Sequence, residues 1–586
     1  MMIPNCLKTH ARRGVRIVRV KNPSVASLIR NQRSYSRADV VTCSCAVFPY
    51  PRIGGHVQFR LQELDDIHPL LCNANNVPKL SHPDREGLLL QEIKQGLEGW
   101  GNWRGEEAAI ERVEVEACLS VREDTGSKYL DMRTVCGLKK QLEGLVLTPL
   151  DRNLGETLVL CPRKYYEAML QLFVMSAGYR VIREPEGVVM EAMRCEVLDA
   201  GLTKLAQWDK KGKFGKVYVM PKHKDLTRFR PIRPTYSEPT VRGCGIVAKA
   251  LNHLLFSLPQ DWHFNLRSLA RLVPRLDSIN SRIARRVGIS SDISAMSYDI
   301  KDMFSKLPHQ KIVEAVDWVV HSHVKKGRSF VRVNSRGRGC SFGRTTGDDY
   351  WRSVPLQQIL TFVQFELNHT YMRATGVLLR QTVGIPMGKS TSPPLTCILC
   401  AFAGYKFLRS LGACIRDVFG IRLMDDVSLI VLERRHCAMK VERIQKLFIA
   451  FYPKNLQLKR TDDDLGAWDF LGTQIRINAL QPFVTCCQVA KNECTIWHSN
   501  GLEFKNGQSY CSWGCKQQKG AVVTCHLHRI DRNTNDRTRI PRQVLSLVRK
   551  LRLKDFPTKT VERIIKHFAK GRDCIWNWTV HWLYPP

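Results

Sequence analysis

Apolar residues in the middle of the chain recur at the spacings of strands and of helices. An apolar stretch over residues 294–300 predicts a strand that runs into an acidic turn. Apolar side chains at helical spacing then predict one buried helix over residues 312–320 and a second over residues 395–402. This alternation of strand and helix patterns indicates a mixed fold.

Two short apolar runs follow, over residues 418–424 and 427–431, and they flank Asp425 and Asp426. Such runs predict two strands joined at an acidic turn. A strand, two helices and a hairpin, in that order, are typical of a split βαβ sheet. We therefore expect an α+β fold in which Asp299, near the end of the first strand, lies close to the hairpin turn.

The end of the chain predicts a helical unit. Residues 542–553 and 561–568 each carry an apolar face at helical spacing, and Gly571 is typical of a helix stop. Residues 1–140 contain no motif that we can interpret.

The net charge indicates which kind of binding partner to expect. The 586 residues are 44% hydrophobic and 25% charged, the ordinary globular range, which excludes a wholly disordered, collagenous or coiled-coil chain. The 90 Lys and Arg exceed the 54 Asp and Glu by 36, an excess typical of a protein that binds a polyanion, most simply nucleic acid. An anionic membrane surface or a ribosome-like scaffold would favour the same charge.

The basic residues are concentrated in three stretches. Residues 1–38 contain nine Lys and Arg and residues 325–344 contain seven, with no acid in either stretch. Residues 537–572 contain twelve against two acids, whereas residues 84–124 contain eleven acids and five bases. A binding track requires such concentration, and solubility alone does not.

The cysteines and the first residues bear on the compartment. The 21 cysteines are scattered, which favours reduced thiols in an intracellular protein, with the nucleus as the first expectation. No apolar stretch reaches the roughly 18–20 residues that a membrane helix needs, so we expect no membrane partner. Residues 1–38 are typical of a mitochondrial or plastid transit peptide, of a basic nucleic-acid-binding arm, or of an upstream extension of a reading frame.

Three carboxylates are the first candidates for chemistry. If the predicted strands are adjacent, Asp299, Asp425 and Asp426 converge at one edge of the sheet, where they repel one another unless cations bind between them. Mg²⁺ prefers oxygen ligands and shares its shell with phosphates. Two such ions activate an attacking 3′-hydroxyl and stabilise a pyrophosphate leaving group. An Asp-Asp pair in a surface turn is the alternative.

The spacing of three blocks carries a family resemblance. A glycine-rich loop over residues 384–395 separates the two acidic sites. The blocks at residues 298–304, 384–395 and 423–427 resemble motifs A, B and C of reverse transcriptases in order and separation. The Trp-Asp-Phe-Leu-Gly block at residues 468–472 is similar to the primer-grip hairpin. The resemblance implies a right-hand polymerase fold, with fingers, a palm with a split βαβ sheet, and a helical thumb.

Upstream blocks extend the resemblance to the fingers. Residues 217–222 and 228–232 look like the segments that hold the incoming triphosphate in that family. A triphosphate needs cationic donors outside the metal site, where Lys supplies a point charge and Arg a planar fork. The resemblance implies these roles for Lys222 and Arg230, with Lys224 as a further candidate.

Within the family, the chain looks most like the Penelope-like reverse transcriptases. Residues 150–155 resemble their Asp-Lys-Gly element, although Arg152 replaces the lysine, and residues 528–532 and 556–557 resemble their thumb. The chain departs from the family by a long basic connection between motifs A and B. No GIY-YIG nuclease follows the thumb, as in members that lack this endonuclease or in a truncated chain. A telomerase catalytic subunit is a less close match, because we find no RNA-binding region of its kind in residues 1–140.

The resemblance also implies the roles of the site residues. Asp299, Asp425 and the Ile300 carbonyl hold two Mg²⁺ ions, with Mn²⁺ as an alternative, and Asp426 supports them. Lys459 is a candidate for protonating pyrophosphate, against the alternative of a solvated lysine. The remaining nucleotide contacts are assigned to the base pair and the sugar: Met387, Gly388 and Phe304. The bulk of Phe304, five residues after Asp299, excludes a 2′-hydroxyl, so dNTPs are the expected substrates; ordinary palm core is its alternative role.

The expected organisation follows. Residues 1–40 are a basic arm or targeting segment, and residues 41–140 have no assigned role. The polymerase parts are the fingers, the palm with a basic insertion at about 323–352, and the thumb with the C-terminal region: residues 141–290, 291–480 and 481–586.

A cluster of cysteine and histidine residues lies in the last part of the chain. Cys511 and Cys515, with Cys525 and His528, miss the usual zinc-finger spacing. Reduced side chains packed in the thumb are the expectation, with zinc binding as the less favoured alternative.

The expected function is that of an RNA-directed DNA polymerase, a nucleotidyltransferase with an RNA template, a DNA primer and dNTPs as partners. The alternatives are a catalytically inactive nucleic-acid-binding protein derived from such an enzyme, and a telomerase-like polymerase.

Overall fold

The computed structural model describes residues 22–37, 42–79, 129–286, 291–343, 350–434, 438–463, 466–478, 483–499 and 501–585, and five single positions between 87 and 113. Residues 1–21 of the predicted arm and nearly all of the acidic segment lie outside the described residues. Among the described helices, none is both long enough and apolar enough to cross a membrane.

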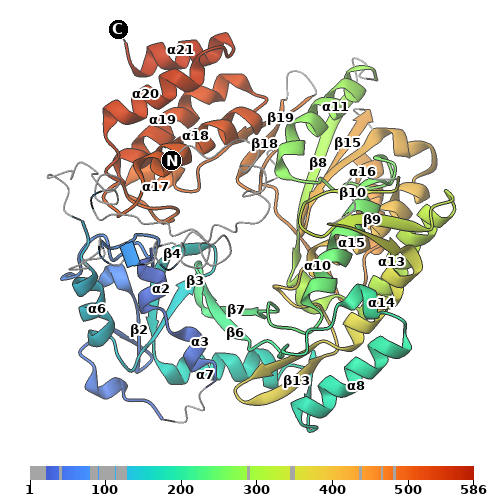
Figure 1. Cartoon of the computed structure of the whole chain (residues 1–586). Helices are drawn as coiled ribbons and strands as arrows, with labels where there is room; N and C mark the ends of the chain where they lie inside the picture. Colours follow the sequence, from blue (N-terminus) through green and yellow to red (C-terminus); the bar gives the residue numbers. More distant parts are fainter. Residues whose placement is uncertain are drawn as a thin grey trace.

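A four-stranded antiparallel sheet lies at the centre of residues 291–480 (Figure 1). Its order is β14-β15-β8-β16, so the hairpin strand β15 pairs directly with the first strand of the region, β8. The strands are β8 (Ser291–Lys301), β14 (Val418–Leu423), β15 (Asp426–Arg434) and β16 (Gln457–Arg460). The predicted order of strand, helix, helix and hairpin is confirmed, and so is a mixed α and β fold.

Both faces of this sheet are buried, and alternate residues serve the two faces. On one face, Val427, Leu429 and Val431 join a core with α13 (His309–Val324) and α15 (Ser392–Ser410). On the other face, Ile430 and Leu432 pack against α11 (Leu272–Ala284) and a second, smaller sheet. Because a shift of one residue would exchange the two faces, this double burial fixes the register of β15 against β8.

The two buried helices predicted from apolar spacing are confirmed as α13 and α15. The second begins earlier than the pattern predicted, at Ser392, with two prolines in its first turn. Proline fits there because the first N–H groups of a helix have no partner within the helix.

The basic connection between these helices folds into a sheet of its own. Strands β9 (Phe330–Asn334), β10 (Cys340–Ser341) and β11 (Trp351–Pro355) form it, in the order β10-β9-β11. Helix α14 (Leu356–Asn368) follows and returns the chain to the core.

Segments from the first 80 residues and from residues 130–161 build one unit. Its sheet has the order β1-β2-β4-β3, and helices α2 (Val25–Ile29) and α6 (Met132–Gln141) share its apolar core. The strands are β1 (Arg52–Ile53), β2 (His56–Arg60), β3 (Val146–Leu150) and β4 (Asn153–Leu160). Residues 25–29 of the predicted arm are therefore part of a folded unit, with Val25 and Ile29 buried.

A two-stranded hairpin connects this unit to the palm sheet. Strands β6 (Tyr218–Lys222) and β7 (Asp225–Ile232) form it, and the Asp151 N–H donates to the Pro221 carbonyl over 2.8 Å. The hairpin therefore lies against the β3–β4 turn.

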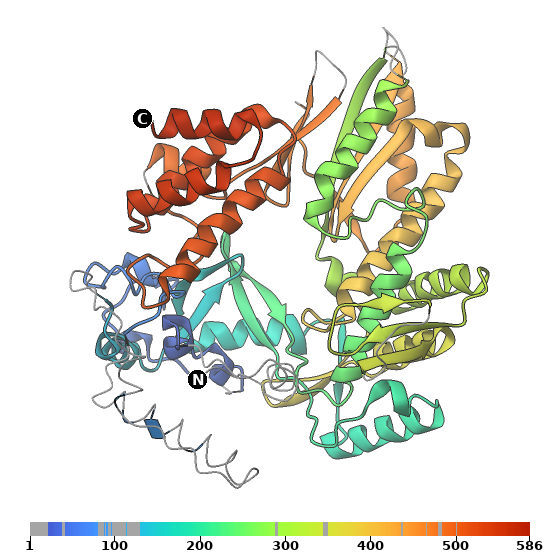
Figure 2. The same cartoon turned by 45° about the horizontal axis from the view of Figure 1, so that its top comes forward.

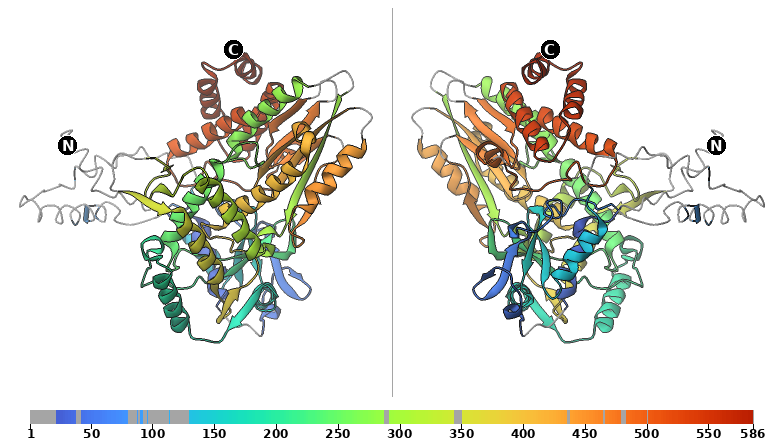
Figure 3. Two further views of the ribbon diagram at one scale, coloured as in Figure 1. Left: turned by 90° about the vertical axis from the view of Figure 1, so that its right-hand side faces the viewer. Right: turned by 90° about the vertical axis from the view of Figure 1, so that its left-hand side faces the viewer.

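The last part of the chain is helical, as predicted, after a three-stranded sheet. That sheet comprises β17 (Ala467–Phe470), β18 (Thr473–Asn478) and β19 (Phe483–Gln488). The helices are α18 (Lys516–Arg532), α19 (Ile540–Arg552), α20 (Thr558–Ala569) and α21 (Cys574–Leu583), around their own apolar core. In side views, α20 and α21 lie at the end of the molecule opposite α8 (Glu186–Asp199) (Figure 3).

The chain closes on itself, because residues 503–513, here called the closing segment, run from the thumb to the N-terminal unit (Figure 2). The Ser509 N–H donates to Asn76 Oδ1 over 2.9 Å, and the Val77 N–H donates to Ser512 Oγ over 2.8 Å. Gly155 permits a close approach: a Cβ there would lie 1.8 Å from the Lys505 carbonyl oxygen. The parts of the molecule therefore follow one another around a ring.

The buried side chain of Asn76 should stabilise the contact between the closing segment and the N-terminal unit. It donates to the Leu70 carbonyl and accepts from the Ser509 N–H, so Asn76→Ala should lower the free energy of unfolding by about 1–3 kcal/mol. Hydrogen–deuterium exchange of residues 503–513 should become faster. Gln62→Ala, at an exposed position of the same unit, is the matched control. Unchanged exchange in Asn76→Ala would contradict the assigned closure.

Candidate active site

The register of the palm sheet brings the predicted acidic residues together. Asp426 lies directly opposite Asp299 in the β15–β8 ladder, and Asp425 lies in the two-residue turn between β14 and β15. The Ile300 N–H donates to the Asp425 carbonyl over 3.2 Å, which ties that turn to the end of β8. Met424, the first residue of the turn, has a φ of +61°, a conformation that tight hairpins require but that side chains rarely adopt.

Polarity increases along one face of the sheet toward these acids. Ile430 lies opposite Ala295 in the apolar core, and the next pair on the same face is Ser428 with Ser297. The indole N–H of Trp468 donates to Ser428 Oγ over 2.9 Å. The following pair is Asp426 with Asp299, so the apolar core ends one pair before the carboxylates.

Two of the carboxylates, Asp426 and Asp299, have raised pKa values. Burial, with the charges of Asp425 and Asp299, raises the pKa of Asp426 to about 7. Burial and the charge of Asp425 also raise the pKa of Asp299. Such a set is under electrostatic stress unless a cation lies nearby. Oxygen donors alone, without sulfur or imidazole, fit Mg²⁺ or Mn²⁺.

Lys459, which the sequence suggested as a proton donor to pyrophosphate, lies close to the carboxylates. It is opposite Asp299 in the β16–β8 ladder, and its charge lowers the pKa of that carboxyl, against the larger effect of burial. It also lines the same cavity as the three acids. Its role in proton transfer stays a prediction.

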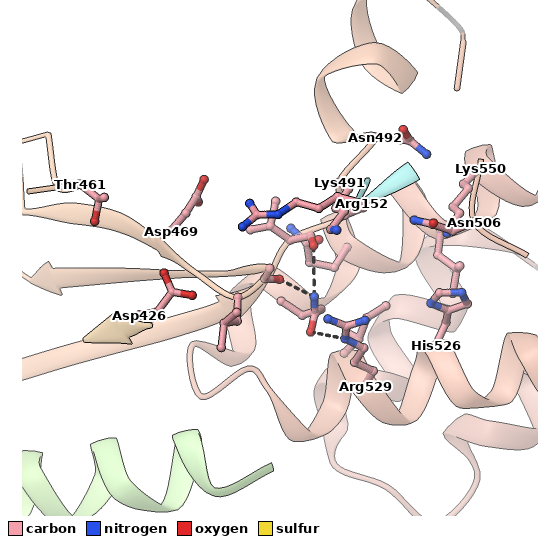
Figure 4. A pocket seen from close by; sticks show the side chains of 18 of the residues that line it. Arg152, Asp426, Thr461, Asp469, Lys491, Asn492, Asn506, His526, Arg529 and Lys550 are labelled. Atoms are coloured by element: carbon pink, nitrogen blue, oxygen red, sulfur yellow. Dashed lines mark hydrogen bonds between the residues drawn. The ribbon is translucent and has the colours of Figure 1, made fainter. Parts of the chain in front are cut away.

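A cavity of about 900 Å³ extends from the carboxylates to the thumb. Lys491, Arg529 and Lys550 line its far side, opposite the palm strands that carry Asp426 (Figure 4). The guanidinium of Arg529 donates to Gln488 Oε1 over 3.0 Å, which fixes its position. The cavity therefore has an acidic side on the β8–β15 strands and a basic side formed by Lys491, Arg529 and Lys550.

Two lysines of the C-terminal helical region are poorly solvated, and one of them, Lys550, lines the basic side of the cavity. Burial lowers the pKa of Lys550, with a further effect of Arg529, and burial with the charge of Lys550 lowers the pKa of Lys554 to about 7. Burial, with the charge of Lys550, also lowers the pKa of His526 to about 4, so its imidazole is neutral near pH 7. Crowded, desolvated cations of this kind gain most from an anionic partner.

Arg152 is a site residue that the sequence analysis did not assign. It lies in the β3–β4 turn at a φ of +68°, lines the cavity, and its charge opposes the rise in pKa of both Asp299 and Asp426. The available signal was its position in the block that resembles the Asp-Lys-Gly element, where it stands in place of the lysine. The cations Lys491, Arg529 and Lys550 were also missed, because no local pattern marks them.

The predicted phosphate-binding residues lie on the β6–β7 hairpin, next to the palm. Lys222 Nζ is 4.0 Å from Asp302 Oδ1, and Arg230 Nη1 is 3.1 Å from Asp151 Oδ1. Neither belongs to the residues that line the cavity, whereas Lys224 does. Each of the two predicted residues is therefore paired with an acid in this state.

The glycine-rich loop is held between the segments that carry Arg233 and Phe304. The Arg233 N–H donates to the Met387 carbonyl over 3.1 Å, and the Ile385 N–H donates to the Phe304 carbonyl over 2.7 Å. Gly388 has a φ of +128°, and a Cβ there would lie 2.4 Å from the Arg233 carbonyl oxygen, so only glycine fits. Phe304 is half-buried against the palm core. The loop residues Met387 and Gly388 do not line the large cavity.

A buried ion cluster lies directly behind this loop. Lys389 pairs with Glu366 and, over 3.3 Å, with Glu238, which also binds Arg233. These charges compensate one another, which fixes the loop against α14 although all of them are buried.

The C-terminal cysteine and histidine set does not come together. Within the described part of the chain, Cys511, Cys515, Cys525 and His528 form no group with metal-ligand spacing. Instead, the imidazole of His528 packs edge-on against Phe568, with ring centroids 4.9 Å apart.

Comparison with known proteins gives only distant similarity. No protein-family model and no curated protein matches the chain. The apo telomerase of Candida tropicalis is similar at a TM-score of 0.46 and 11% identity, over 82% of this chain and 83% of that one. Telomerase from Candida albicans in complex with a fragment of telomeric RNA has a TM-score of 0.47 and 13% identity, over 88% of this chain and 83% of that one. The BmCPV RNA-dependent RNA polymerase at its elongation state has a TM-score of 0.31 and 11% identity, over 53% of this chain and 26% of that one. At TM-scores below 0.5, these similarities carry no conclusion about function.

The raised pKa of Asp426 predicts a pH-dependent loss of stability. Between about pH 4 and pH 7 the folded state holds a proton that the unfolded state releases, so stability falls as the pH rises through this window. Asp426→Asn removes the carboxyl that ionises, and with it this loss of stability. In EDTA near pH 8 it should raise the free energy of unfolding by about 2 kcal/mol, and near pH 4 the gain should almost vanish.

Thermal unfolding at the two pH values checks this expectation, and Mg²⁺ should reduce the difference near pH 8 by stabilising the wild type. Asp469→Asn is the matched control, because Asp469 is exposed, lines the same cavity and lies outside the cluster. An equal gain from both variants, or a full gain that persists near pH 4, would contradict the assigned repulsion.

Proposed function

We propose that this protein is an RNA-directed DNA polymerase that adds dNTPs to the 3′ end of a primer. One observation carries the proposal: the β8–β15 register sets Asp299 opposite Asp426, with Asp425 in the adjoining turn, at the mouth of a cavity with a cationic far wall. An acidic centre suits metal-assisted phosphoryl chemistry, and the cationic wall suits a nucleic-acid backbone.

The cavity would hold the template–primer duplex. Lys491, Arg529 and Lys550 would contact its phosphates, a sequence-independent interaction that weakens with salt. Arg152 lies between this wall and the acids, where it would balance the negative charge of the reacting phosphates. The basic sheet β10-β9-β11 and the basic helices of the thumb would extend the binding surface.

The carboxylates would hold two Mg²⁺ ions. Asp299, Asp425 and the Ile300 carbonyl are the proposed ligands, and Asp426 supports them. When bound, such ions activate the primer hydroxyl and neutralise the leaving pyrophosphate. The chain itself would position the reactants, and Lys459, opposite Asp299, would donate a proton to pyrophosphate.

The fingers hairpin would bind the triphosphate. Lys222 and Arg230 are the proposed donors, and their present acidic partners, Asp302 and Asp151, would yield them to the nucleotide. Lys224 already lines the cavity. Met387 and Gly388 would contact the nascent base pair, and Phe304 would lie under the sugar and exclude a 2′-hydroxyl.

We infer a Penelope-like retroelement, or a gene derived from one, as the source of this polymerase. Support comes from the block at residues 150–155, which builds the β3–β4 turn and brings Arg152 into the cavity. RNA as template and the nucleus as compartment belong to the same proposal.

Primer extension on an RNA template, with Mg²⁺ and dNTPs, tests the polymerase function. Wild type should extend the primer, and Asp299→Asn or Asp425→Asn should reduce the rate by about 100-fold or more, because the metal ligands are lost. Asp469→Asn should retain activity. A folded wild type that binds the duplex but extends it on neither RNA nor DNA templates would favour a non-catalytic nucleic-acid-binding protein.

The side chain of Phe304 predicts the sugar preference. Phe304→Ala should raise the incorporation of NTPs relative to dNTPs by about tenfold, because the space under the sugar then accepts a 2′-hydroxyl. Single-nucleotide incorporation with each substrate measures the ratio, and the melting temperature checks folding. Preferential incorporation of NTPs by the wild type would refute the assigned role of Phe304.

A further inference from the structure

Four metal-ligand side chains meet in the N-terminal unit, away from the carboxylates. Cys43, Cys45, His56 and Cys161 each offer one ligand atom, and these four atoms lie within 4.8 Å of one another. Cys43 Sγ is 3.5 Å from His56 Nδ1. Among the described residues, this is the one group of three or more His, Cys, Asp or Glu side chains whose ligand atoms lie close enough together to hold a metal ion.

Three distant segments are folded so that these side chains meet. Cys45 begins a 3-10 helix (Cys45–Val47), and His56 begins β2 after the tight turn at Gly54 and Gly55. Cys161 follows β4 and caps α7 (Pro162–Met169). Ten residues lie between Cys45 and His56, and 104 lie between His56 and Cys161.

The backbone around the sulfur atoms is arranged to support ligands. The Val57 N–H donates to Cys45 Sγ over 3.3 Å, and the Cys161 N–H donates to the Val57 carbonyl over 2.9 Å. The first of these bonds stabilises thiolate charge on Cys45, and the second fixes the backbone of Cys161 beside β2. Cys45 and Cys161 are buried, and Cys43 closes the group at the surface.

We propose that Cys43, Cys45, His56 and Cys161 bind one structural zinc ion. Three sulfurs and one imidazole nitrogen are a donor set that selects zinc over Mg²⁺. A tetrahedral site with zinc–sulfur bonds of about 2.3 Å has ligand atoms about 3.8 Å apart, so the group needs only a small contraction. Four protein ligands leave no open position, which indicates a structural and not a catalytic ion.

The zinc would join the start of the folded chain to the polymerase core. Within residues 43–56, Phe48 and Tyr50 pack against the apolar core of the unit, whereas Val47 and Ile53 are exposed. Cys161 belongs to β4 and α7, and β4 begins at the turn that carries Arg152. The ion would thus stabilise the unit that positions Arg152. This proposal is independent of the polymerase function, and it revises the expectation from sequence, in which zinc binding was the less favoured alternative.

The experiment uses the full chain, purified in the presence of zinc and free of added chelator. Elemental analysis should find about one zinc per chain. Cys45→Ser and Cys161→Ser should lose it, whereas Cys72→Ser and Cys136→Ser, at free cysteines outside the group, should retain it. Removal of zinc from the wild type by a chelator should lower the melting temperature, and zinc alone should restore it.

A second measurement keeps the test valid if the buried-cysteine variants fail to fold. Cobalt(II) added to the metal-free wild type should give the thiolate charge-transfer band and the intense visible bands of a tetrahedral site. The exposed variant Cys43→Ser should give a weaker charge-transfer band. A folded wild type without zinc, a disulfide between two of the three cysteines, or cobalt spectra that Cys43→Ser leaves unchanged would each overturn the proposal.

Discussion

The pairing of β15 with β8 in a single register is the constraint on which the site depends. Both faces of the sheet are buried, so the alternation of Val427, Leu429 and Val431 with Ile430 and Leu432 admits one alignment. That alignment, chosen by apolar packing, also sets Asp426 opposite Asp299. The energy that brings two like charges together therefore comes from the hydrophobic cores on either face of the palm sheet.

The central part of the fold was predictable because its signals are local. Apolar spacing marked α13, α15 and the β14–β15 hairpin, and the acidic turn between two strands indicated where Asp299, Asp425 and Asp426 would meet. The start of α15 differed by a few residues, since prolines are compatible with a first helical turn.

The missed residues depend on contacts between distant segments. Arg152 reaches the acids through the β3–β4 turn, and Lys491, Arg529 and Lys550 reach the cavity from the thumb. No periodicity within a segment encodes such convergence. The same reason hid the sheet β1-β2-β4-β3, in which strands from residues 52–60 and 146–160 pair across more than 80 residues of chain. The group at Cys43, Cys45, His56 and Cys161 was hidden in the same way.

The closing segment has a topological consequence. Because Ser509 and Ser512 bind the N-terminal unit, the protein encircles whatever occupies the cavity between palm and thumb. A long polymer held there can dissociate only by sliding out at one of its ends or after several polar contacts break together. Enclosure of this kind would lengthen the residence time of the bound polymer without stronger contacts to it.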